Sequence, residues 1–152
     1  MTAAALPLAL YIVQLASSWF MTGLIWFVQI VHYPLLPEVG EAIYPRYQAG
    51  HMKRTGWVVA PVMLVELVTA VAAIWAPPPG LSGFAVWTGL ALLGAIWLST
   101  FLFQIPAHDR LSRGLDRPTQ QLLVRGNWIR TIAWTSRAVL LLGPLTTIST
   151  SV

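Results

Sequence analysis

The stretch WVVAPVMLVELVTAVAAIW, residues 57–75, decides the fold. It holds a single ionisable side chain, Glu66, among mostly apolar residues. At about 1.5 Å of rise per residue it forms a helix about 27 Å long, close to the thickness of a bilayer core. Trp57 and Trp75 lie at its two ends, and amphipathic aromatic side chains favour the membrane interfaces. The stretch therefore predicts a membrane-spanning helix.

Three further apolar runs have a comparable length, at residues 8–33, 84–105 and 128–148. The whole chain is 57% hydrophobic and only 9% charged, whereas a soluble domain carries roughly 25% charged residues. The runs lack the apolar–polar alternation that a membrane β-barrel requires. The sequence therefore predicts an all-α fold, an integral membrane four-helix bundle in which residues 1–152 form a single domain.

Most basic residues gather in the connections that follow the first and third spans. Residues 76–83 and both ends of the chain carry no charged side chain. Lys and Arg in short loops favour the cytoplasmic side of a membrane. We therefore expect loops 1 and 3 in the cytoplasm and the N and C termini on the opposite, non-cytoplasmic side, in a bacterial inner (plasma) membrane. The net charge of +4 then needs no nucleic-acid partner, and the expected partners are the lipid bilayer and a hydrophobic small molecule.

Two charged side chains interrupt the apolar runs. Glu66 and Arg137 each follow an interfacial tryptophan, Trp57 or Trp128, by nine residues. Both helices enter from the same side, so both charges lie about 13 Å deep. An unpaired charge at that depth is severely penalised. We predict a salt bridge between the second and fourth spans, which either clamps the bundle or forms the floor of a polar pocket.

Other polar side chains fall on single faces of the predicted helices, at 100° per residue, and should converge inside the bundle. Asn127 and Arg130 lie one turn apart and can present donors to a carbonyl or phenolate oxygen. Alternatively, Arg130 and the loop arginines contact anionic lipid headgroups. The candidate catalytic residues are His108, Asn127, Arg130 and Gln104, and the candidate substrate-binding residues are Gln29, Trp97, Trp134, Glu66 and Arg137.

All three histidines, His32, His51 and His108, are expected near the cytoplasmic end. With a carboxylate they can bind copper, iron or zinc, so a His-bound transition metal is one candidate cofactor. They equally fit hydrogen-bonding roles near the headgroups, since no HxxH or HxxxH spacing is present. Haem is less favoured because His51 should lie above the membrane plane. The absence of cysteine excludes an iron–sulfur cluster.

Five segments together resemble a known family. They are VHYPLLPEVG (31–40), YPRYQAGH (44–51), PVMLVEL (61–67), FLFQIPAHDRLSRGLD (101–116) and NWIRTIAWTSR (127–137). The chain is similar in these segments to the anthrone-oxygenase-like family of small four-helix membrane proteins. That resemblance implies a compact bundle that oxygenates a polycyclic phenolic substrate to a quinone without an obvious cofactor. It assigns no catalytic residue.

We expect a membrane-embedded oxidoreductase, an oxygenase that acts on a hydrophobic small molecule at the cytoplasmic end of the bundle. His108 or His32 would remove a proton or hold a metal, and Asn127, Arg130 and Gln104 would stabilise the negative oxygen. Two alternatives involve no catalysis. One is a membrane metal- or lipid-binding or transport protein working as a homo-oligomer, although polar groups at only one end argue against transport. The other is an accessory subunit packed against a partner.

Overall fold

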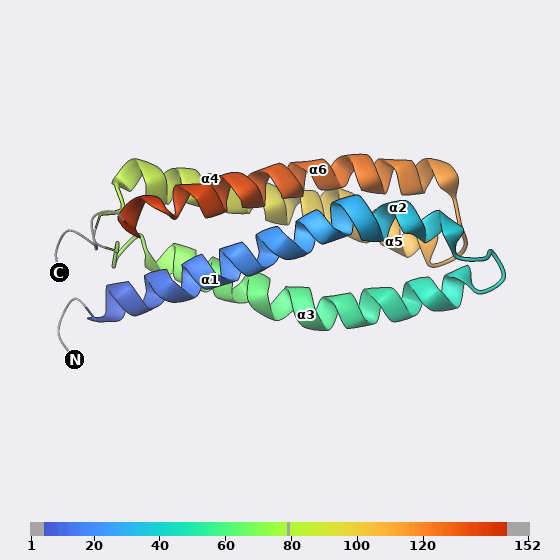
Figure 1. Ribbon diagram of the computed structural model, residues 1–152, viewed down its shortest axis with the longest axis horizontal. Coiled ribbons are helices and arrows are strands. Elements are labelled where there is room, and N and C mark those ends of the chain that lie inside the picture. The colour runs from blue at the N-terminus through green and yellow to red at the C-terminus, as the bar shows by residue number, and fades with distance from the viewer. Residues whose placement is uncertain (1–4, 79, 146–152) are drawn as a thin grey trace.

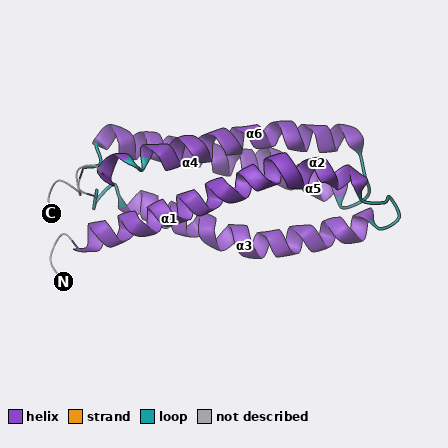
Figure 2. Cartoon of the chain, viewed as in Figure 1, coloured by secondary structure: helices purple, strands orange, loops and turns teal. Residues whose placement is uncertain are grey.

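The computed structural model describes residues 5–78 and 80–145, and every regular element in these ranges is a helix (Figure 2). The helices form four long columns that run side by side (Figure 1). The start of the first column and the end of the fourth lie at one end of the bundle, and the connections 39–43 and 112–116 lie at the other. The predicted all-α fold with four helices is confirmed.

Two of the columns are continuous α-helices and two contain a change of helix type. The first column runs through α1 (Ala5–Phe27), the π-helical turn η1 (Val28–His32), α2 (Tyr33–Leu35) and the 3-10 turn η2 (Leu36–Glu38). The second is α3 (Tyr44–Ala72). The third runs through α4 (Gly83–Ser99), the π-helical turn η3 (Thr100–Gln104) and α5 (Ile105–Leu111), and the fourth is α6 (Arg117–Leu140).

Three helical segments are long and apolar enough to cross a membrane: Ala5–Glu38, Tyr44–Ala72 and Gly83–Leu111. They contain the first three predicted spans almost completely. The fourth column, α6, is not among them, because its length includes several arginines, two of which, Arg130 and Arg137, are buried inside the bundle. The predicted fourth span, 128–148, also extends past the described residues, which end at 145.

The outer faces of the bundle are covered with large apolar side chains. Trp19, Phe27, Phe84 and Trp87 are among them, each more than 40% exposed. A soluble monomer rarely exposes so much contiguous apolar surface, because contact with water is unfavourable. The exposed side chains and the three apolar helices indicate association with a lipid bilayer.

Each π-helical turn lies two residues before a proline. Pro34 and Pro106 have no backbone N–H, so neither can complete the ordinary α-helical bond. The residue just before each proline bonds five positions back instead, Tyr33 N–H to Val28 O and Ile105 N–H to Thr100 O. Such π-helical turns are rare and are frequent at functional sites. Both turns place polar side chains toward the interior at the same end of the bundle.

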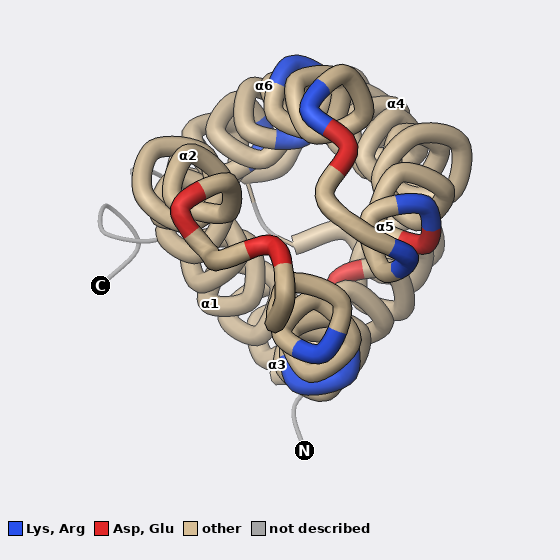
Figure 3. Tube along the Cα trace, turned by 90° about the vertical axis from the view of Figure 1, so that its right-hand side faces the viewer, with Lys and Arg blue, Asp and Glu red and all other residues tan. Residues whose placement is uncertain are grey.

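Buried apolar side chains hold the columns together in two clusters. One lies in the middle of the bundle and consists of Met21, Ile25, Met63, Ala70, Leu93, Ile96, Ala133 and Trp134. The other lies near the connections and consists of Tyr33, Leu36, Tyr44, Leu111 and Leu123. Most charged side chains gather around this second end (Figure 3). The candidate site lies between the two clusters.

Candidate functional site

A cavity of about 290 Å³ opens between all four columns, lined by residues of both apolar clusters. This volume is at the lower end of the range for small-molecule sites. Its wall is mostly apolar, from Met21 and Ile25 of α1 through Val59 and Met63 of α3 to Trp97 of α4. The polar residues of the lining are Tyr33, His51, Thr55, Thr100, Gln104, His108 and Arg130. An apolar space with a few polar groups is typical of a pocket for a hydrophobic ligand.

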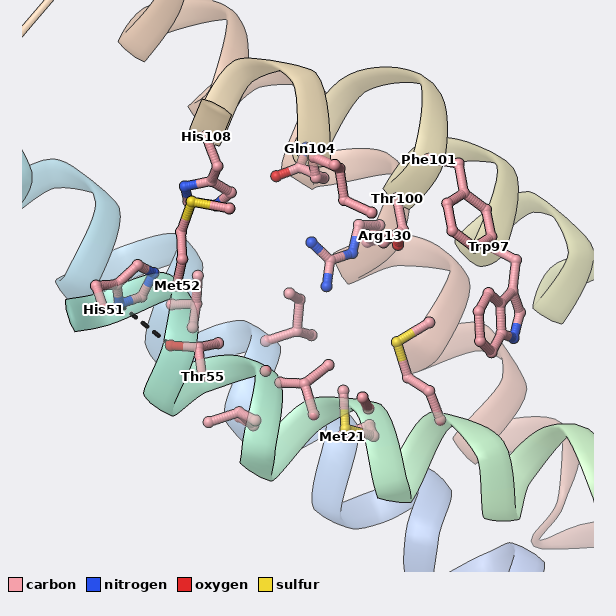
Figure 4. A pocket seen from close by; sticks show the side chains of 18 of the residues that line it. Met21, His51, Met52, Thr55, Trp97, Thr100, Phe101, Gln104, His108 and Arg130 are labelled. Carbon is pink, nitrogen blue, oxygen red and sulfur yellow. Dashed lines mark hydrogen bonds between the residues drawn. The ribbon is translucent and has the colours of Figure 1, made fainter. Parts of the chain in front are cut away.

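Arg130 brings a positive charge into this space. Figure 4 shows its guanidinium projecting into the cavity, with His51 and His108 at one end and Trp97 at the other. Arg130 is only 7% exposed, and its buried Nε has no hydrogen-bond partner. Its guanidinium lies over the ring of Trp134, 5.1 Å from the centroid, and interacts with the side chain of Tyr33. Neither of the two ion pairs found in the described part of the chain includes Arg130.

His108 is held by a chain of side-chain hydrogen bonds. The Nε2 amide of Gln48 lies 2.6 Å from Nδ1 of His108, and an amide nitrogen only donates. In this arrangement Nδ1 accepts and Nε2 carries the proton, which is donated to the hydroxyl of Tyr33 at 2.9 Å. Tyr33 in turn donates to Oε1 of Gln104 at 3.2 Å. Both nitrogens of His108 therefore bind protein groups, so its ring positions Tyr33 and is not free to bind a substrate directly.

The three imidazoles lie together, but their geometry does not suit a metal. His32 stacks on His51 with ring centroids 4.3 Å apart and planes 26° apart, and His108 lies 5.5 Å from His51. Nitrogens of stacked rings point along parallel planes and do not converge on one point. Within residues 5–78 and 80–145, no group of three or more His, Cys, Asp or Glu side chains is placed to hold a metal ion. The candidate metal ligands His32, His51 and His108 thus gain no support as a metal site.

His51 is the histidine that faces the cavity with a free nitrogen. Its Nδ1 pairs with Oγ1 of Thr55 at 3.2 Å, one turn along α3. Its Nε2 makes no hydrogen bond within the described residues and is not among their buried, unpartnered atoms. This nitrogen can exchange a proton with a molecule in the cavity.

Asn127 and Gln29 lie outside the cavity wall and bond to each other. The amide of Asn127 donates to Oε1 of Gln29 at 2.8 Å, and the amide of Gln29 donates to the carbonyl of Val124 at 3.3 Å. These bonds tie the π-helical turn η1 to α6. Asn127 therefore does not share the cavity with Arg130, although one turn of helix separates them.

The predicted salt bridge between Glu66 and Arg137 is confirmed, with Nε of Arg137 3.5 Å from Oε1 of Glu66. Ser18 donates to the same oxygen at 2.5 Å, and the indole of Trp134 donates to Oε2 at 2.9 Å. Arg137 also donates to the carbonyl of Gly89 at 2.8 Å. Neither member of the pair lines the cavity, and the pair joins the second and fourth columns as a clamp.

Sequence reasoning found part of the lining. Five predicted site residues line the cavity: His51, Trp97, Gln104, His108 and Arg130. Six others do not: Gln29, His32, Glu66, Asn127, Trp134 and Arg137. It missed Tyr33 and Gln48, which hold His108. The spacing of Tyr44, Gln48, His51 and Thr55, which follows one helix face, was the available signal.

Comparisons with protein-family models, with curated proteins and with solved structures found no match to the chain. The resemblance to the anthrone-oxygenase-like family therefore stays a prediction from sequence segments. A function has to be inferred from the chemistry of the cavity.

Proposed function

We propose that the four columns form an integral membrane bundle in a bacterial inner membrane, with the connections 39–43 and 112–116 in the cytoplasm and both termini on the other side. The three apolar helices and the large exposed side chains support the membrane location. The basic residues at one end support the orientation (Figure 3). The arginines of α6 are compatible with this location, because Arg130 and Arg137 face the interior.

Within this bundle, the cavity binds a flat hydrophobic molecule that carries an acidic oxygen, and the protein is an oxygenase for that molecule. The observation that carries this proposal is the charge of Arg130, buried at an apolar cavity without a carboxylate partner. A buried cation costs several kcal/mol unless an opposite charge offsets the desolvation. A phenolate or enolate oxygen would supply that charge, and the apolar wall would hold the rest of the molecule.

The lining residues suit the removal of a proton from such a ligand. Arg130 would stabilise the negative oxygen, as donors in a water-excluded site do most effectively. His51 would accept the proton at Nε2, the ring nitrogen that makes no hydrogen bond within the described residues. Tyr33, held by His108 and Gln104, would line the space beside Arg130 in which that oxygen binds.

The resulting electron-rich substrate would react with dioxygen. For a methylene group activated by the phenolate ring, loss of the proton gives a carbanion that attacks oxygen. The net reaction turns CH₂ and O₂ into C=O and H₂O, so dioxygen takes all four electrons that the carbon loses. The resemblance to the anthrone-oxygenase-like family supports this reaction type.

A closed inner end favours a pocket over a transport path. One turn beyond the lining residues Met63 and Arg130, the helices contribute Glu66 and Trp134, which bond to each other and to Ser18. This buried, hydrogen-bonded layer lies between the cavity and the other half of the bundle. A transporter needs polar groups on both sides of the membrane midplane.

The test compares Arg130→Met with Arg130→Lys in protein reconstituted into liposomes. The probe is a hydroxylated anthrone, whose binding quenches the fluorescence of Trp97 and Trp134, and whose oxidation consumes oxygen. Loss of a charge-assisted hydrogen bond of about 1.5–3 kcal/mol weakens binding about 10- to 100-fold in R130M, with a smaller loss in R130K. Arg125→Met is the matched control, since Arg125 is exposed on the same helix and lies outside the cavity lining.

Each outcome decides between the candidate functions. Binding that depends on Arg130, together with oxygen uptake, supports the oxygenase. Binding that depends on Arg130 without oxygen uptake or product favours a lipid-binding or accessory protein. Equal binding by the parent and R130M refutes the role of Arg130.

A further inference from the structure

The cavity wall is open on one side of the bundle. Gly56 and Ala60 of α3 line the cavity and are exposed on the outer surface. Across from them, Phe101 of η3 and Ile105 of α5 also line the cavity and are 54% and 45% exposed. A residue that faces both the cavity and the outside marks an opening in the wall. We call these four residues the lateral opening.

Small residues keep this opening wide on the α3 side. Gly56 and Ala60 lie one turn apart, so they share a helix face. A Cβ added at Gly56 would meet no atom within 4 Å. The opposite side carries the larger Phe101 and Ile105, which are therefore the only bulky groups of the four at the opening.

The surface around the lateral opening is apolar. Trp57 and Val58 flank it on α3, and Leu98 and Leu102 flank it on the third column, all more than 45% exposed. One turn before Gly56, the ammonium of Lys53 lies 5.2 Å from the ring of Trp57, at the place where a headgroup region would begin. With the helices in a bilayer, the opening faces acyl chains directly below the headgroups.

A second approach to the cavity starts from the aqueous end. A surface groove beside it is lined by Arg46, Tyr47, Gly50 and Arg54, and it shares His51 and Thr55 with the cavity. This basic groove suits water-dissolved anions. The cavity, however, has a mostly apolar wall, and a molecule that fits it partitions into the membrane.

We infer that the ligand is a membrane-dissolved molecule that enters sideways from the cytoplasmic leaflet, through the lateral opening between Gly56 and Ala60 on α3 and Phe101 and Ile105 on the third column. This inference rests on the proposed membrane location and pocket. It narrows the substrate class to amphiphiles that reside in the leaflet with their acidic oxygen near the headgroups. Inside the cavity, Arg130 and His51 then contact the acidic oxygen of the ligand, whichever end of the molecule enters first from the acyl-chain region.

The test uses the absence of cysteine from the chain. Met63→Cys places one thiol in the cavity wall at a position that is only 3% exposed. In liposomes, its alkylation by the neutral, membrane-soluble N-cyclohexylmaleimide reports entry into the cavity and does not require the natural ligand. A sulfonated maleimide, which stays in water, reports entry from the aqueous groove.

Two leucine substitutions provide the comparison. Gly56→Leu fills the lateral opening, and Gly50→Leu fills the basic groove; both glycines lie in α3 and both have open space at Cβ. Replacing a helical glycine favours the helix in each case, so both variants should fold. We expect G56L to slow alkylation by N-cyclohexylmaleimide about tenfold or more, a barrier increase of only about 1.4 kcal/mol, and G50L to leave the rate within about twofold.

Slower alkylation in G56L alone supports lateral entry. An unchanged rate in G56L, or slower alkylation in G50L instead, overturns it. Failure of the proposed function is distinguishable, because the anthrone binding assay depends on Arg130 whereas the alkylation assay does not. Phe101→Ala is a further check, since shortening the opposite side of the opening should speed alkylation.

Discussion

Replacing Glu66 by glutamine should destabilise the bundle far more than its small change in shape implies. Both carboxylate oxygens accept bonds from buried donors, Oε1 from Ser18 and Oε2 from Trp134. Glutamine has a single acceptor oxygen, so its amide would turn N–H groups toward one of these donors. Arg137, only 1% exposed, would also lose the negative charge 3.5 Å away.

The magnitude follows from burial. Removing one member of a buried ion pair costs about 3–5 kcal/mol, because the remaining charge stays desolvated. Glu66 and Arg137 are 0% and 1% exposed, so this range applies to each of the single variants Glu66→Leu and Arg137→Met. The double variant Glu66→Leu with Arg137→Met removes both charges and keeps apolar volume. We expect the double variant to lose much less free energy of unfolding than the two single variants lose together, since replacing a whole buried pair is often close to neutral.

The assay is reversible unfolding in mixed detergent micelles, followed by far-UV circular dichroism. The exposed pair of Asp109 and Arg113, 63% and 77% exposed, provides the control. Asp109→Asn should change the free energy of unfolding by about 1 kcal/mol or less. The reasoning is refuted if the free energy of unfolding of E66Q lies within about 1 kcal/mol of the parent's. It is also refuted if the loss in the double variant equals the sum of the losses in the two single variants.

Two further predictions concern the site and the clamp. Gln48→Glu replaces the amide that donates to Nδ1 of His108 by an acceptor, so the ring proton should move from Nε2 to Nδ1. The ¹⁵N chemical shifts of the labelled His108 ring measure this move. Unchanged shifts would contradict the assigned hydrogen bonds. Gly89→Leu should cost about 1–3 kcal/mol of unfolding free energy, because a Cβ there lies 3.4 Å from Nη1 of Arg137. The same change at Gly94, where a Cβ meets open space, should cost nothing measurable in the same unfolding assay.

Hydropathy predicts the columns because the membrane penalty acts on every residue of a span. It does not predict where α3 begins. The helix starts at Tyr44, well before the predicted span at 57, and residues 44–56 form an extension in which Tyr44 and Gln48 are buried while Arg46, Lys53 and Arg54 are exposed. Gln48 lies on that extension, so its hydrogen bond to His108 could not be predicted from the apolar runs alone. Tyr33 was equally hidden, since an interfacial tyrosine gives no sign of the imidazole that its hydroxyl binds.

The clamp was predictable because depth alone brings its members together. Two conditions suffice: the two opposite charges lie at equal depth from the same side of the membrane, and each helix turns its charged face toward the bundle interior. By contrast, the partners of Asn127 depend on how far η1 rotates the first column, and a π-helical turn changes that rotation. Helical spacing calculated at 100° per residue across η1 or η3 is therefore offset beyond the turn.

The two halves of the chain follow the same plan, and this explains why the clamp lies at the centre. Each half has a π-helical turn that ends two residues before a proline, Pro34 or Pro106. A long helix follows, with a proline in its first turn, Pro45 or Pro118, and with a tryptophan nine residues before the buried charge. Counterparts are separated by 71–73 positions. Glu66 and Arg137, which correspond in this way, meet inside the bundle, where two like charges would repel. The neighbouring groups explain why the acid is at position 66 and the base at position 137. The indole N–H of Trp134 only donates, so its partner at 66 must accept, and the carbonyl of Gly89 only accepts, so its partner at 137 must donate.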